Sequence, residues 1–94
     1  MLRMTQANEA NDTYTVVASL VERSGNSCQG PAIDRLARFE NAFEFLLARQ
    51  DKIAADLEQL RSQSRTQSVS FKQLLAEKLM NQSILVLFRS YGLD

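Results

Sequence analysis

The chain has 94 residues, of which 45% are hydrophobic and 23% are charged, and its eleven basic side chains balance eleven acidic ones. This composition is typical of one small folded domain, and it argues against a disordered chain or a basic arm for nucleic acid. Histidine is absent, which removes the usual catalytic base and the commonest metal ligand.

The N-terminal stretch is polar, so we expect residues 1–11 to be flexible and residues 12–94 to form a single helical domain. Residues 12–24 fit two structures. Asp12 could cap a short helix, whereas residues 13–17 are types that strands favour. Strict alternation of apolar and polar residues is absent, so a short helix or an irregular segment is the prediction for this stretch.

Residues 25–30 have the composition of a linker, and they contain the only cysteine, Cys28. A lone cysteine cannot form a disulfide within its chain, so we expect a free thiol. The first apolar run lacks the basic start of a secretory signal, and no run approaches the ~20 apolar residues that span a bilayer. These features predict a cytoplasmic protein.

The strongest pattern covers residues 31–64, which we expect to form one long helix. Gly30-Pro31 puts the proline at the first helical position, where its missing N–H has no cost. Apolar residues then recur with the alternating three-four spacing of a coiled-coil seam, which Gln50 interrupts at an a-type position. The seam consists of Leu36, Phe39, Phe43, Leu46, Ile53, Leu57 and Leu60.

A polar break at residues 63–69 separates this helix from a second one, which we expect over residues 71–91. Ser70 and Gln73 match a capping box at its start, and Gly92 suits a left-handed cap at its end. A short break makes consecutive helices antiparallel neighbours. The expected contacts pair Phe71 with Leu60, Leu75 with Leu57, Leu79 with Ile53, and residues 84–88 with Phe39, Phe43 and Leu46.

Such a hairpin carries more apolar surface than its two helices can cover, because residues 84–88 are apolar all round a helix. A second copy is the simplest cover, so we expect an all-α fold in which two long hairpins form a dimeric four-helix bundle. Gln50 could then pair with its symmetry mate and set the register. The residues predicted for the interface are Phe39, Phe43, Phe45, Leu46, Leu47, Leu87, Phe88 and Tyr91.

These expectations favour a small protein–protein interaction module: an adaptor, regulator or assembly factor that self-associates through coiled-coil-like helices. The alternative is a small dimeric DNA-binding transcriptional regulator. It depends on Arg61, Arg65 and Lys72 at the hairpin tip and on a strand over residues 13–21, and the neutral overall charge weighs against it. The residue patterns indicate no catalytic, cofactor-binding or metal-binding group.

One further comparison starts from Ile33-Asp34-Arg35-Leu36, Leu46-Leu47-Ala48-Arg49 and Ile53-Ala54. These residues loosely resemble the first helix of the all-helical chorismate mutases. The resemblance implies a small all-helical enzyme in which Arg49 binds a dicarboxylate substrate. It covers only part of the first long helix, and the later basic and polar residues of that family have no convincing counterparts here. It is therefore a remote alternative.

Overall fold

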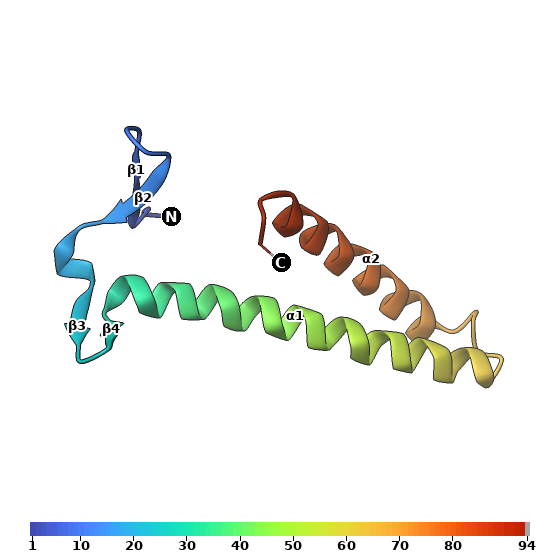
Figure 1. The fold of residues 1–94 in the computed structure, drawn as a ribbon. Helices are drawn as coiled ribbons and strands as arrows, with labels where there is room; N and C mark the ends of the chain where they lie inside the picture. The colour runs from blue at the N-terminus through green and yellow to red at the C-terminus, as the bar shows by residue number, and fades with distance from the viewer. Residues whose placement is uncertain (94) are drawn as a thin grey trace. The chain divides into compact units, whose positions relative to one another are not determined.

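The computed structural model describes residues 1–93, which form four short strands followed by two helices (Figure 1). The predicted all-α fold and its dimeric four-helix bundle are therefore wrong, because two β-hairpins precede the helices. The elements are β1 (Thr5–Asn8), β2 (Thr13–Val16), a 3-10 turn η1 (Ala18–Leu20), β3 (Glu22–Ser24), β4 (Ser27–Gln29), α1 (Pro31–Ser62) and α2 (Val69–Ser90).

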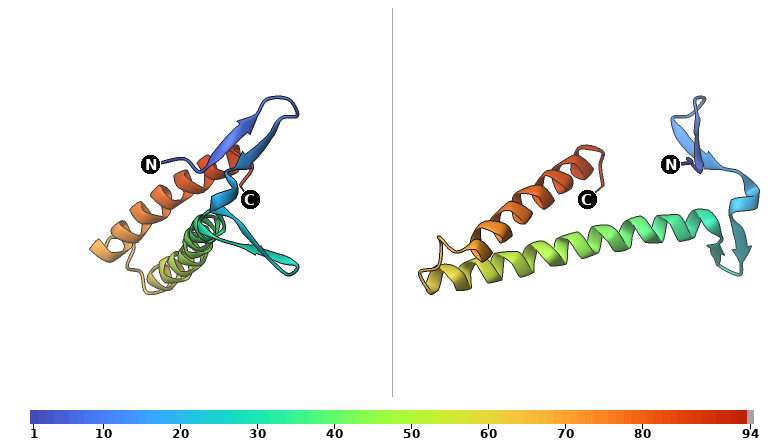
Figure 2. Two further views of the ribbon diagram at one scale, coloured as in Figure 1. Left: turned by 90° about the vertical axis from the view of Figure 1, so that its left-hand side faces the viewer. Right: turned by 180° about the vertical axis from the view of Figure 1, so that it is seen from behind.

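The chain divides into two compact units at a point inside α1. The first unit, Met1–Ala42, holds both β-hairpins and the first turns of α1, whereas the second begins at Phe43 and holds the rest of α1 with α2 (Figure 2). Within the part of the chain that the structure describes, neither helix is long and apolar enough to cross a membrane. Residues 12–94, expected to form a single helical domain, include β2, β3 and β4.

The stretch that was expected to hold a short helix instead contributes β2 to the first hairpin. β1, inside the stretch expected to be flexible, pairs antiparallel with β2, so that Thr5 lies opposite Val16 and Asn8 opposite Thr13. The β-branched residues of β2 form a strand here because β1 supplies the neighbouring strand that the ladder requires. Asp12, expected to cap a helix, has a φ of 54° and lies in the left-handed turn between the strands.

The expected linker forms the second hairpin, in which β3 and β4 pair antiparallel around Gly25 and Asn26. Gly25 has a φ of 61°, and two-residue hairpin turns favour glycine at such a position. Gly30, directly before Pro31 at the start of α1, has a φ of 130°, and a Cβ there would lie 2.6 Å from the carbonyl oxygen of Leu20. Glycine at this position therefore lets η1 pass close to the first turn of α1.

α1 and α2 both end in Schellman motifs, in which a left-handed residue turns the chain back onto the last turn. At the end of α1 the Arg65 N–H donates to the Leu60 carbonyl at 2.8 Å, and Ser64, with a φ of 56°, holds the left-handed position. α2 ends in the same way at Gly92, the residue predicted for this cap. A serine rather than a glycine therefore carries the backbone strain at the turn between the helices.

α2 begins two residues earlier than predicted. Ser68 is its N-cap, and the Oγ of Ser68 accepts a hydrogen bond from the Phe71 N–H at 3.1 Å. Ser68 has the extended backbone that an N-cap needs, whereas Ser70 already lies inside the helix. The predicted capping box between Ser70 and Gln73 is therefore wrong, because the N-cap lies two residues earlier, at Ser68.

The second unit is held together by a seam between α1 and α2, which run antiparallel from their connecting turn (Figures 1 and 2). Near the turn, Ile53, Leu57 and Phe71 form a buried cluster. Farther from the turn, the rings of Phe43 and Phe88 meet with their centroids 5.9 Å apart. The partly buried residues that pack against the cluster are Leu60, Leu74 and Leu75.

Leu79 corrects the predicted pairing of the two helices. It was expected beside Ile53, but it is 58% exposed, whereas Asn81 and Leu85 are buried. Two steps of three residues lead along the α2 seam from Leu75 to the buried Asn81. Leu79 does not lie on this line, so it faces away from α1. The seam therefore changes from apolar to polar at this level.

Candidate functional site

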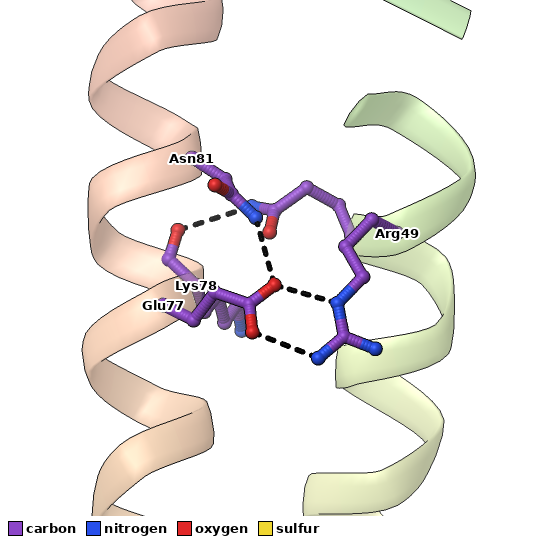
Figure 3. Close-up of polar contacts among 5 residues, drawn as sticks. Arg49, Glu77, Lys78 and Asn81 are labelled. Atoms are coloured by element: carbon purple, nitrogen blue, oxygen red, sulfur yellow. Dashed lines mark hydrogen bonds and ion pairs between the residues drawn. The ribbon is translucent and has the colours of Figure 1, made fainter. Parts of the chain in front are cut away.

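One turn along α1 from Ile53, the seam becomes a polar layer (Figure 3). The Nε of Arg49 donates to the Oε2 of Glu77 at 2.6 Å, and Nη2 donates to Oε1 at 2.8 Å. The Nδ2 of Asn81 also donates to Oε2 of Glu77, at 3.4 Å. The hydrogen bonds from Arg49 hold the pKa of Glu77 below its usual range, and the same bonds raise the pKa of Arg49. This two-pronged ion pair joins the two helices in one register.

Gln50 turns its carboxamide into the same layer. Its Nε2 donates to the Lys78 carbonyl at 3.1 Å, whereas its Oε1 is buried with no hydrogen-bond partner among the described residues. A buried oxygen that lacks a donor is unfavourable, so this end of the Gln50 side chain lowers the stability of the hairpin. The pairing of Gln50 with a symmetry mate stays a prediction, since the amide here bonds within its own chain.

The polar layer lacks the composition of a metal centre. Within residues 1–93, no group of three or more cysteine or carboxylate side chains comes together to hold a metal ion. The resemblance to chorismate mutases would direct Arg49 at a dicarboxylate substrate, but the carboxylate that it faces is that of Glu77. In this structure the layer links α1 to α2 through the hydrogen bonds of Arg49 and Gln50.

The residues predicted for an interface fall into two groups. Phe43, Leu46 and Phe88 are partly buried, and Phe43 and Phe88 contact each other between the helices. The structure therefore uses Phe43 and Phe88 inside the hairpin. The predicted residues that remain exposed are Phe39, Phe45, Leu47, Leu87 and Tyr91.

α2 carries an exposed apolar stripe of which the sequence interpretation identified only half. Met80, Ile84, Leu87 and Tyr91 are all exposed, and they are separated by four, three and four residues. This spacing places them on one side of a helix. Met80 and Ile84 were missing from the predicted interface, although the repeated spacing is a signal that could have found them.

Phe45 of α1 lies on the same side of the hairpin as this stripe. Arg49 and Glu77 bridge the helices on one side of the seam. Phe45 precedes Arg49 by one turn, and Met80 follows Glu77 by three residues, so both side chains lie on the side of the ion pair. We define the stripe surface as Phe45, Met80, Ile84, Leu87 and Tyr91.

The first unit holds a second candidate site, a hollow of about 410 Å³ between its N-terminal residues and the start of α1. Arg35 joins these two parts, because its Nη1 donates to the Leu2 carbonyl. The Nε of Arg3 donates to the Thr5 carbonyl at 3.0 Å, and its guanidinium carbon lies 5.6 Å from the centroid of the Tyr14 ring. The walls of this N-terminal hollow include Met4, Val16, Val21, Ile33, Leu36 and Phe39.

The hairpin tip, which the DNA-binding alternative requires, has part of its charge engaged within the chain. The guanidinium carbon of Arg61 lies 5.4 Å from the centroid of the Phe71 ring, and its Nη1 is 3.6 Å from a carboxylate oxygen of Glu58. Residues 13–16 do form a strand, but it pairs with β1 of the same chain. These contacts do not favour nucleic acid, and the alternative stays an untested prediction.

No protein-family model, curated protein or solved structure matches this chain. Function must therefore be inferred from the surfaces themselves. The stripe surface and the N-terminal hollow are two places where large apolar side chains of the described residues gather without cover. Apolar patches of this kind on small proteins mark interaction or ligand sites more often than scattered apolar residues do.

Proposed function

We propose that the protein is a small protein–protein interaction module that self-associates through the stripe surface. The observation that carries this proposal is a row of large apolar side chains, at coiled-coil spacing, on a helix that already packs through a different face. Fully burying one such side chain contributes roughly 1.5–3 kcal/mol. A symmetric second copy would cover the stripe of one chain with that of the other.

The proposed role is that of an adaptor, regulator or assembly factor that acts by bringing chains together. The polar outer faces of α1 would stay open to other molecules in such an assembly. We further propose a cytoplasmic location, because Cys28 is an exposed free thiol and the cytoplasm keeps such thiols reduced.

A pair of matched substitutions tests this function. Leu87 and Leu79 both lie on α2 and are 54% and 58% exposed, but only Leu87 belongs to the stripe surface. Leu87→Ala should remove about 1 kcal/mol per copy, since about half of the side chain remains to be buried, and so ~2 kcal/mol per symmetric dimer. The Kd of self-association should rise about thirtyfold, because 1.4 kcal/mol corresponds to tenfold.

Sedimentation equilibrium across a dilution series measures this Kd, and far-UV circular dichroism checks that each variant keeps its helices. Leu79→Ala should leave the Kd unchanged. A wild-type chain that stays monomeric at every concentration contradicts self-association. Equal weakening by both substitutions, or weakening by Leu79→Ala alone, would show that the stripe surface is not the interface.

A further inference from the structure

The N-terminal hollow has two cations at its edge and no acid that pairs with them. Arg3 and Arg35 both line it, and within residues 1–93 neither forms an ion pair with a carboxylate. Each guanidinium has one nitrogen bonded to a backbone carbonyl, Arg3 to Thr5 and Arg35 to Leu2. The remaining N–H groups can donate to an anion, since arginine presents five such donors in a planar fork.

The two guanidinium groups are held near the same short stretch of backbone. Arg35 donates to the carbonyl of Leu2, which is bonded directly to the nitrogen of Arg3, and Arg3 in turn bonds to Thr5. This arrangement draws α1 and the N-terminal residues together at the charged end of the hollow. A carboxylate is an anion whose planar oxygens match an arginine fork.

Apart from Thr5 and the two arginines, the side chains that line the hollow are apolar, so they suit an apolar group. Val16 and Val21 lie on the hairpin side, and Ile33, Leu36 and Phe39 lie on the α1 side. Ile33, Leu36 and Phe39 recur at three-residue steps over the first turns of α1, so they form one continuous apolar side. The volume of about 410 Å³ lies within the range of small-molecule sites.

We propose that the N-terminal hollow binds a straight-chain fatty acid, with its carboxylate at Arg3 and Arg35 and its tail against the apolar wall. Charge complementarity selects an anion, and the absence of polar side chains other than Thr5 and the two arginines selects an apolar tail. This site is independent of the stripe surface, since every residue of the hollow belongs to the first unit.

The probe for this proposal is decanoate, titrated into the full chain below its micelle-forming concentration. Binding is measured by calorimetry and located by NMR chemical shifts, which should change at Val16, Val21, Ile33 and Leu36. Decanol, which has the same tail without the charge, should bind about tenfold more weakly or not at all. Decyltrimethylammonium should not bind, because it brings a cation to two arginines.

Variants of the two arginines test whether their charge, rather than the fold of the first unit, determines decanoate binding. Arg3→Gln should weaken decanoate binding about tenfold, and Arg35→Gln should do so at least equally. Arg23→Gln is the matched control, because Arg23 is an arginine of the same unit that bonds to the Gly25 carbonyl at 3.2 Å and does not line the hollow. It should leave binding unchanged. If Arg35→Gln loosens the N-terminal residues, Arg3→Gln alone still gives a decisive result.

Four outcomes would overturn the proposal. Equal affinity for decanoate and decanol would show that the arginines do not recognise the carboxylate. Equal losses in Arg3→Gln and Arg23→Gln would show a general charge effect. Chemical-shift changes at Met80 and Leu87 instead of Ile33 and Leu36 would place the ligand on the stripe surface. Tighter binding of a short apolar peptide than of decanoate would assign the hollow to a protein segment.

Discussion

Leu57→Ala should remove a large part of the stability of the helical hairpin. Leu57 is 0% exposed and forms a buried cluster with Ile53 and Phe71. Truncating a fully buried leucine costs about 3–5 kcal/mol, because the apolar transfer energy is lost and a cavity remains. Domains of this kind have a total stability of about 5–15 kcal/mol, so the loss should be visible as a lower urea midpoint.

The matched control is Leu79→Ala, a leucine on the same hairpin that is 58% exposed. It keeps less than half of its side chain out of water, so its truncation should cost about 1 kcal/mol or less. Both variants are unfolded in urea and followed by far-UV circular dichroism at one low protein concentration, because self-association would add to the apparent stability. If Leu57→Ala costs no more than Leu79→Ala, the described pairing of α1 with α2 is wrong.

The remaining predictions concern the backbone turns and the ion pair. Ser64→Gly should raise the unfolding free energy by about 0.5–1 kcal/mol, because Ser64 is strained at a φ of 56°, and an unchanged urea midpoint would contradict this. Gly30→Ala should lower the thermal midpoint more than Gly25→Ala, since both have positive φ but only the Cβ at Gly30 would meet the Leu20 carbonyl at 2.6 Å; equal losses would refute the close approach. The hydrogen bonds from its arginine partner lower the pKa of Glu77 in the folded state, so the stabilisation it provides is present above the unfolded pKa of about 4.3 and is lost as pH falls through the folded value. The stability difference between the wild type and Glu77→Gln should therefore shrink as the pH falls below about 5, and a difference that is independent of pH would count against the ion pair.

The two helices could be predicted from the sequence because their signals are local and repeated. Pro31 at a helix start, the three-four spacing from Phe43 to Leu60, and Gly92 at a helix end each act over a few residues. A helix satisfies its hydrogen bonds within its own segment, so such a pattern needs no knowledge of the rest of the chain. The error at the start of α2 arose because Ser68 and Ser70 are both good caps, and the sequence alone does not choose between them.

The β-hairpins could not be predicted in the same way. The residue types at positions 13–17 favoured a strand, but a strand depends on a partner strand. The partner, β1, lies in a stretch whose polar composition does not indicate a strand. Leu87 and Tyr91 of the stripe surface were predicted as interface residues, whereas Met80 and Ile84 were not. Which apolar residues of α2 stay exposed depends on where its seam meets α1.

The sequence by itself determined that two long helices form, that their connection is short, and that they carry more apolar side chains than their seam uses. Only the tertiary structure decided which side chains those are. Arg49 and Glu77 come from separate helices, and Phe45 and Met80 lie on the side of their ion pair. It also decided that Arg3 and Arg35 meet at one hollow, because hydrogen bonds to backbone carbonyls bring distant parts of the chain together. Such contacts depend on the packed geometry of several elements, which no spacing within a single segment encodes.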